Sequence, residues 1–231
     1  MAERYQLAYQ AVIFDFDDTL VATLAAKWAQ HREVAKAYYG VDIPEAELRA
    51  HWGKPFDALI SLLYKNADSV ENMKAANRSL DEWYPKRELP GARKTLGWIL
   101  EHGVAVGILS SDNTYYIIRD LVRLRFPVNR IFHIQGADDT KRHKPDPEVF
   151  AAIISKLTAN DIGLGEILYV GDSMSDCYAA RDAGIGFVGV TTGLVDSAAF
   201  KALGFGAVSS IAELPEWLRR EALARSGVSG A

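Results

Sequence analysis

The chain has 231 residues, 49 % of them hydrophobic and 24 % charged, with a net charge of −4 and a pI near 5.8. This composition is that of an ordinary globular protein, and its weak acidity argues against a nucleic-acid or membrane-surface partner. The single cysteine, Cys177, excludes an intramolecular disulfide, and no signal peptide or membrane-spanning apolar run is recognisable. We therefore expect a cytoplasmic protein.

The first predicted element is a buried strand that ends in two acids. The apolar run Ala11–Phe14 stops at Asp15, and Asp17 follows two residues later. Side chains at i and i+2 of an extended chain point to the same side, so both carboxylates can face one site. This spacing suits a nucleophile with an acid/base partner, or a cation site. The alternative is a polar turn, in which Asp and Thr are common.

The next segment, residues 21–89, has a helical pattern and no convincing central strand. Helices are predicted at 24–39, 44–50, 56–66 and 70–83. An insertion of about 70 residues is long enough to pack as a small domain. We expect a helical domain at 21–89, acting as a lid over the two acids, and a core domain formed by 1–20 and 90–231.

Four further apolar runs follow, at 104–109, 131–134, 167–170 and 187–190. They are apolar throughout rather than alternating, which is typical of central parallel strands covered on both faces. Helical patterns separate them, and a terminal helix is predicted from residue 216. The alternation predicts an α/β fold, a doubly wound three-layer parallel sheet of Rossmann-like type. In such folds the ligand site lies at the carboxyl ends of the strands.

The helix starts in this region have recognisable signals. Asp146 is a predicted N-cap with Pro147 at the first helical position, for a helix that reaches residue 157. Ser173 or Ser175 begins another helix, which ends just before Gly184. These starts place polar side chains at the ends of the preceding strands.

Three polar clusters stand at or near those strand ends. Ser110 and Ser111 can cradle a phosphate, although helix capping is the plainer interpretation of Ser110 alone. Lys144 can place a charge on a phosphoryl group or pair with a nucleophile, although a lone lysine is more often solvated. Asp172 and Asp176 are hard oxygen ligands suited to Mg²⁺, or else an N-cap and an unrelated surface acid.

The order acid pair, hydroxyl, lysine, acid pair closely resembles the haloacid dehalogenase-like (HAD) hydrolase superfamily. DFDDT, LSSD, KPDPE and GDSMSD match its four motifs in order, so the resemblance covers nearly the whole chain. The helical insertion corresponds to what that family calls a C1 cap. Within the superfamily, the chain is most similar to the phosphoglycolate phosphatase and β-phosphoglucomutase branch. One departure is Val21-Ala22-Thr23, where relatives often carry an acid and a serine.

The resemblance implies a Mg²⁺-dependent phosphatase that hydrolyses a small phosphate monoester through an aspartyl-phosphate. Asp15 would be the nucleophile and Asp17 the general acid and base. Asp17 favours phosphate esters over halides, because a departing halide needs no proton. Phosphate oxygens would be bound by Ser110, Ser111 and Lys144, with Ser110 and Lys144 counted among the catalytic residues. The implied metal ligands are Asp15, Asp17 through its backbone carbonyl, Asp172 and Asp176.

The insertion is expected to set substrate specificity. The candidate loop contains His51, Gly53 and Lys54, and extends to Pro55. Three weaker candidates, interpreted as solvated helix residues, are Lys27, His31 and Arg49.

Alternatives remain open at this level. A phosphomutase would use the same core residues but return the phosphoryl group to a sugar phosphate. A phosphorylation-dependent signalling module is disfavoured by the length of the chain and by its insertion. The substrate and the oligomeric state, monomer or homodimer, are not determined by the sequence.

Overall fold

A computed structural model describes residues 7–54 and 56–227. They form two compact units. The core unit combines the chain up to Ala22 with the chain from Glu88 onward, and the insert unit is Thr23–Arg87. The expected insertion, 21–89, extends two residues further at each end. Within the described ranges, no helix is both long enough and apolar enough to cross a membrane.

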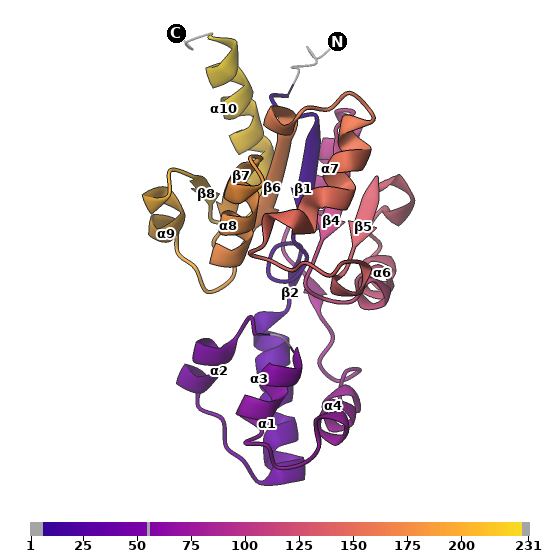
Figure 1. The fold of residues 1–231 in the computed structure, drawn as a ribbon, viewed down its shortest axis with the longest axis vertical. Coiled ribbons are helices and arrows are strands. Elements are labelled where there is room, and N and C mark those ends of the chain that lie inside the picture. Colours follow the sequence, from indigo (N-terminus) through magenta and orange to yellow (C-terminus); the bar gives the residue numbers. More distant parts are fainter. Residues whose placement is uncertain (1–6, 55, 228–231) are drawn as a thin grey trace. The chain divides into compact units, whose positions relative to one another are not determined.

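The core unit is built on a six-stranded parallel sheet with the strand order β5-β4-β1-β6-β7-β8 (Figure 1). The chain runs outward from β1 to β4 and β5, then returns to β6 on the other side of β1, so the order reverses beside β1. The strands are β1 (Ala11–Phe14), β4 (Ala105–Leu109), β5 (His133–Gln135), β6 (Ile167–Gly171), β7 (Gly186–Val190) and β8 (Gly206–Val208).

Both faces of this sheet are buried, as the uniformly apolar strands predict. Along β1, Val12 and Phe14 join one hydrophobic cluster, whereas Ala11 and Ile13 join the other. This alternation follows from the period of two along a strand. The parallel sheet is confirmed, and its two covered faces explain the absence of a polar alternation in the sequence.

Among the described residues, six helices cover the two faces of the sheet and complete the three layers. Buried residues of α5, α6 and α10 belong to the Val12 cluster, and those of α7, α8 and α9 belong to the Ile13 cluster. The helices are α5 (Ala92–Glu101), α6 (Thr114–Arg123), α7 (Ala151–Thr158), α8 (Met174–Asp182), α9 (Ser197–Ala202) and α10 (Leu214–Ser226). Short 3₁₀ turns occupy Val128–Arg130, Ala137–Asp139, Pro147–Phe150, Leu164–Glu166 and Ile211–Glu213.

Two predicted elements of the core unit differ in detail. The strand expected at 131–134 lies at His133–Gln135, because the Ile131 amide donates to the Val128 carbonyl (3.1 Å) and closes a 3₁₀ turn before the strand begins. The helix after Asp146 begins as a 3₁₀ turn and becomes α-helical only at Ala151. Its predicted N-cap is confirmed, since the Asp146 carboxylate accepts from the Glu148 amide.

The insert unit contains four helices around a hydrophobic cluster of its own, which includes Trp28, Leu63 and Met73. The helices are α1 (Leu24–Tyr39), α2 (Glu45–His51), α3 (Phe56–Leu63) and α4 (Val70–Arg78). The predicted last turns of α3 and α4 are not helical. Where the chain passes between the units, β2 (Val21–Ala22) and β3 (Arg87–Glu88) form a two-stranded sheet.

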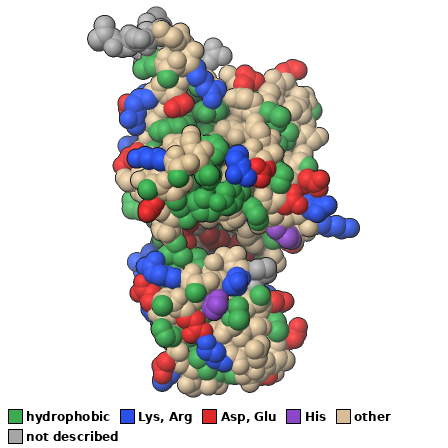
Figure 2. All heavy atoms as spheres, turned by 60° about the vertical axis from the view of Figure 1, so that its left-hand side comes forward, with side chains coloured by type: hydrophobic (Ala, Val, Ile, Leu, Met, Phe, Trp, Pro, Cys, Tyr) green, Lys and Arg blue, Asp and Glu red, His purple; other side chains and the backbone are tan. Residues whose placement is uncertain are grey.

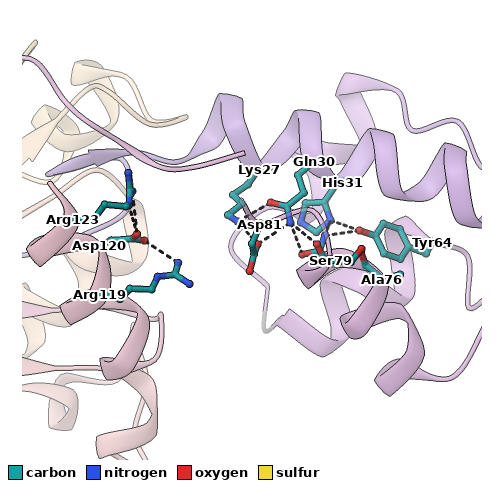
Figure 3. A network of polar contacts seen from close by, with 11 residues as sticks. Lys27, Gln30, His31, Tyr64, Ala76, Ser79, Asp81, Arg119, Asp120 and Arg123 are labelled. Carbon is teal, nitrogen blue, oxygen red and sulfur yellow. Dashed lines mark hydrogen bonds and ion pairs between the residues drawn. The ribbon is translucent and has the colours of Figure 1, made fainter. Parts of the chain in front are cut away.

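A buried polar network inside the insert unit corrects one expectation (Figure 3). His31 is not solvated but 3 % exposed, and its Nδ1 lies 2.9 Å from the Tyr64 hydroxyl. Asn77 donates to the same hydroxyl (2.7 Å), and Gln30 donates to the Asn77 carbonyl (2.6 Å). Burial, assisted by the positive charge of Lys27, lowers the pKa of His31 to about 4. The His31 ring can be buried because the Tyr64 hydroxyl gives its Nδ1 a hydrogen-bond partner.

Lys27 and Arg49, the two other helix residues expected to be solvated, differ in their exposure. Lys27 is partly buried and pairs with Asp81 (2.8 Å), so it is not a freely solvated lysine. Arg49 is exposed, as expected, and pairs with Glu45 one helical turn earlier.

Candidate active site

The site begins where β1 ends, at Asp15. The Asp15 amide donates to the Val170 carbonyl on β6 (2.8 Å), so ladder bonding continues one residue beyond the strand, and Asp15 is 5 % exposed. The chain then turns tightly, with the Asp18 amide bonded to the Val21 carbonyl and Asp18 itself at φ 55°. Asp has a short polar side chain that tolerates this left-handed conformation. The turn leaves Asp17 half-buried directly beyond the strand.

Lys144 reaches Asp15 from the segment before α7. Its Nζ lies 2.7 Å from Asp15 Oδ1 and 2.6 Å from Asp176 Oδ1, and its side chain is 7 % exposed. Burial alone would lower the pKa of Lys144, but Asp15 and Asp176 together hold it well above its usual value. The lysine is therefore a buried cation and not a solvated surface residue.

Asp172 and Asp176 come from the junction between β6 and α8. Ser173 is the N-cap of α8, and its hydroxyl and the Asp176 carboxylate form a reciprocal capping box. Asp176 is buried and Asp172 half-buried. Both acids thus sit beside the end of β1, as neighbouring parallel strands require.

Asp15, Asp172 and Asp176 each offer a carboxylate oxygen within 4.8 Å of the others. Burial raises the pKa of Asp15 to about 7, with Lys144 opposing the shift and Asp176 adding to it. Burial and then the charges of Asp15 and Asp176 also raise the pKa of Asp172 well above its usual range. Hard oxygen donors with uncompensated negative charge fit a small divalent cation such as Mg²⁺. The donor set of this cluster therefore suits that metal.

Two glycines make room for these acids. A Cβ on Gly171 would lie 2.6 Å from the Cβ and Cγ of Asp176, and a Cβ on Gly193 would overlap a carboxylate oxygen of Asp172. Gly171 is the first residue of the GDSMSD motif. Gly193 lies in the loop after β7, and nothing local in the sequence indicates its closeness to Asp172.

Two hydroxyl residues near the acids were not predicted as site residues. Tyr169 on β6 places its hydroxyl 2.9 Å from Asp176 Oδ1 and 3.2 Å from Lys144 Nζ. Thr19 lies with its hydroxyl 3.5 Å from Asp172 Oδ1. A tyrosine inside an otherwise apolar buried run was the one available signal, because its hydroxyl needs a partner there.

The serines behave differently from each other. Ser110 is buried at the end of β4, and its hydroxyl accepts from the Asp112 amide (3.1 Å), which is the local turn contact expected of a capping serine. Ser111 is exposed. Both follow the strand adjacent to β1, but no contact joins their hydroxyls to the acid cluster among the interactions described for the core unit.

The predicted specificity residues lie in the insert unit, at the end of α2 and in the turn after it. His51 is half-buried, and its Nδ1 is buried without a hydrogen-bond partner among the described residues. Gly53 has φ 86°, and Gly53 and Lys54 are exposed. Pro55, which was assigned to the same loop, lies outside the described residues.

The arrangement brings four predicted residues together: Asp15, Lys144, Asp172 and Asp176. A buried carboxylate held beside an ammonium, next to a candidate cation site, is suited to nucleophilic attack on an anionic group. The lysine and a cation would offset the repulsion between the carboxylate and that anion.

Comparisons with known proteins agree with this geometry. The family model for haloacid dehalogenase-like hydrolases matches residues 12–190. The chain is 30 % identical over 206 residues to a phosphoglycolate phosphatase from Photorhabdus laumondii, covering 84 % of this chain and 85 % of that enzyme. It is 31 % identical over 135 residues to a phosphoglycolate phosphatase from Pseudomonas fluorescens, where the match spans 48 % of the relative's length.

A solved structure shares the fold. A crystal structure provisionally assigned as a β-phosphoglucomutase from Thermotoga maritima aligns with a TM-score of 0.77 and 26 % identity. The alignment covers 91 % of this chain and 99 % of that one.

Proposed function

Because this chain belongs to the haloacid dehalogenase-like hydrolase family, we propose that it is a phosphatase that hydrolyses a small phosphate monoester through an aspartyl-phosphate on Asp15. The similarity to the phosphoglycolate phosphatases of P. laumondii and P. fluorescens supports phosphatase activity and makes 2-phosphoglycolate the first substrate to test. The observation that carries the mechanism is the buried contact of 2.7 Å between Lys144 Nζ and Asp15 Oδ1, beside two further acids.

In the first half-reaction, an Asp15 carboxylate oxygen attacks phosphorus and the bond between phosphorus and the ester oxygen breaks. Asp17 gives its proton to the departing alkoxide, so the alcohol leaves neutral. Lys144 keeps Asp15 in place and offers positive charge to the phosphoryl oxygens. Ser110 and Ser111 are proposed as further donors to those oxygens, which requires the Ser110 hydroxyl to turn its proton toward the substrate.

In the second half-reaction, Asp17, now ionised, takes a proton from water as the water oxygen attacks phosphorus. The bond between phosphorus and the Asp15 oxygen breaks, which releases inorganic phosphate and restores the carboxylate. Asp17 has regained its proton, so the site is ready for another cycle.

The proposed Mg²⁺ would be held by Asp15, Asp172 and the backbone carbonyl of Asp17, with Asp176 in the ligand set or directly behind it. When bound, the cation would offset the repulsion between the nucleophile and the anionic substrate. The carboxylate cluster and the raised pKa values of Asp15 and Asp172 support this assignment.

The test is phosphate release from a panel of phosphorylated metabolites that includes 2-phosphoglycolate, measured with Mg²⁺ and with EDTA. We expect steady release for at least one monoester, and loss of release when EDTA removes the metal. No Mg²⁺-dependent release from any member of a broad panel would overturn the proposal.

A phosphomutase is the second candidate, favoured by the likeness to the T. maritima structure. Incubation with a hexose 1-phosphate separates the two, since a mutase yields the 6-phosphate with little free phosphate. Isomerisation that exceeds phosphate release would replace the phosphatase assignment.

We assign substrate preference to the insert unit, with His51, Gly53 and Lys54 as candidate contacts. Replacing the exposed Lys54 by Met should change KM across the panel more than it changes kcat with each substrate.

A further inference from the structure

Tyr169 is a phenol buried in the middle of β6. Its Cα pairs with Ile13, two residues before Asp15, and its side chain is fully buried in the same cluster as Ile13. A phenylalanine would fill this space without the cost of burying a hydroxyl. The hydroxyl must therefore be accounted for by its partners.

Those partners belong to the candidate active site. The Tyr169 oxygen lies 3.2 Å from Lys144 Nζ, 2.9 Å from Asp176 Oδ1 and 3.3 Å from the Leu109 carbonyl oxygen. An ammonium can only donate, so the phenol accepts from Lys144. Its single proton is then available to Asp176 or to the Leu109 carbonyl.

With these contacts the ammonium uses all its donors. Lys144 has three protons and three partners: Asp15 Oδ1 (2.7 Å), Asp176 Oδ1 (2.6 Å) and the Tyr169 hydroxyl. No proton of the Lys144 ammonium is left to donate to water.

The Asp176 carboxylate is similarly satisfied. Its Oδ1 is contacted by Lys144 and Tyr169, and its Oδ2 accepts from the Ser173 amide (3.0 Å) and the Ser173 hydroxyl (2.5 Å). A carboxylate has about four lone-pair sites, so all these contacts can form at once when Tyr169 donates to Oδ1, and they favour a place for Asp176 directly behind the proposed metal. Asp176 is thereby a fixed anchor for the lysine.

We propose that Tyr169 is a positioning residue for phosphoryl transfer, which holds the Lys144 ammonium against Asp15 by bonding both Lys144 and Asp176. This inference rests on the proposed function, because the position of Lys144 affects turnover only if Asp15 carries the phosphoryl group. The competing explanation is packing alone, since the ring lies edge-on to Phe150 with centroids 4.8 Å apart. Packing requires the ring, whereas positioning requires the oxygen.

The variant Tyr169→Phe separates the two, because it removes the oxygen and keeps the ring. We expect kcat for the best monoester to fall about tenfold or more with KM changed less than about twofold, as for residues that orient a catalytic group. The matched control is Tyr9→Phe, which removes the hydroxyl of a buried tyrosine before β1, at the opposite end of that strand from Asp15, and should leave kcat unchanged. A kcat for Tyr169→Phe within twofold of the wild type would overturn the proposal.

A second measurement needs no turnover. In a ¹⁵N–¹H correlation spectrum of lysine ammonium groups, the buried Lys144 ammonium should exchange slowly enough with water to give a signal, identified by its loss in Lys144→Met. That signal should disappear or shift in Tyr169→Phe and persist in Tyr9→Phe. An unchanged signal in Tyr169→Phe, or no Lys144 signal in the wild type, would overturn the proposal.

The two measurements keep the failures distinguishable. A wild-type protein that releases phosphate from no monoester contradicts the proposed function, and the ammonium spectrum still decides whether Tyr169 holds Lys144. An active wild type with an unaffected Tyr169→Phe variant contradicts this inference alone.

Discussion

At the scale of single residues, the candidate site concentrates negative charge around one ammonium. Asp15, Asp172 and Asp176 lie close together, and Lys144 contacts two of them. The raised pKa values of Asp15 and Asp172 express the cost of keeping both ionised in a buried place. A divalent cation would remove that cost, and this links the electrostatics of the cluster to the proposed chemistry.

The first prediction concerns Asp15, the proposed nucleophile. Asp15→Asn should lower kcat about a thousandfold or more, because an amide does not form the phosphorylated intermediate. The variant should still fold, since it removes a charge from a crowded acidic cluster. The measurement is phosphate release by protein purified in parallel with the wild type. Normal turnover by Asp15→Asn would contradict the mechanism.

The second prediction concerns the metal. Mg²⁺ at about 100 times its Kd should stabilise the wild type by roughly 2.7 kcal/mol, seen as a higher midpoint of thermal unfolding that EDTA abolishes. Asp172→Asn should lose most of this gain, because it removes one of the proposed ligands.

The matched control for that experiment is Asp182→Asn, which removes an exposed acid on α8 that pairs with Arg181. This variant should keep the full Mg²⁺ effect. Equal stabilisation of the two variants would mean that Asp172 does not bind the cation.

At the scale of elements, strand ends and helix starts decide which side chains meet. The Ser173 capping box orients Asp176 at the start of α8, and Gly171 leaves the space that its carboxyl group occupies. In the insert unit, His31 from α1, Tyr64 from the turn after α3 and Asn77 from α4 form one buried polar network (Figure 3). A network of this kind stabilises the fold only while each member keeps its protonation state.

The third prediction follows from His31, whose pKa is lowered by burial to about 4 in the folded state. The unfolded chain binds a proton near pH 6.5, so the folded state is disfavoured as the pH falls from 6.5 toward 4. The contribution of neutral His31 to the free energy of unfolding is fully present above pH 6.5, and its loss approaches about 3 kcal/mol at pH 4. Denaturant unfolding at several pH values between 6.5 and 4 measures this loss of stability.

The comparison variant for that measurement is His31→Asn, which keeps a polar side chain in the network without a group that titrates in this range. Its stability should fall less steeply than that of the wild type between pH 6.5 and 4. His102→Gln changes an exposed histidine and should leave the slope of the wild type unaltered. Identical slopes for His31→Asn and the wild type would show that His31 does not carry the pH dependence.

At the scale of the whole molecule, the described residues contain three separate hydrophobic clusters, two on the faces of the core sheet and one in the insert unit. The face drawn in Figure 2 carries basic, acidic and apolar side chains, and some of the apolar ones adjoin to form patches. The separation of the clusters implies that a defect in one need not spread to the others.

The fourth prediction tests this separation. Leu63 is fully buried in the insert unit, so Leu63→Ala should cost about 2–5 kcal/mol there through the cavity it leaves. Hydrogen exchange measured by mass spectrometry should accelerate in peptides from 23–87 and stay slow in peptides that contain β1 and β6. Equal acceleration in both units would show that they unfold as one cooperative body.

Local patterns were sufficient for much of the fold. The strands at Ala11–Phe14 and Ile167–Gly171 follow from uninterrupted apolar runs, and the start of α8 follows from the capping signal of Ser173. β8 was missed because three residues that include a glycine carry too little pattern. The burial of His31 was missed because its partners, Tyr64 after α3 and Asn77 on α4, are 33 and 46 residues away.

The sequence by itself determined the parallel sheet and the helical insertion. It also predicted that Asp15, Lys144, Asp172 and Asp176 come together. Asp15 and Asp172 directly follow β1 and β6, Asp176 lies in the first turn of α8, and the carboxyl ends of parallel strands meet at one edge, whereas Lys144 lies in the loop after β5. Only the tertiary structure decided that Tyr169 bonds Lys144 and Asp176, and that Gly193 leaves room for Asp172. Those contacts depend on which strands become neighbours and on how closely side chains pack between them, and neither is encoded in a local pattern of residues.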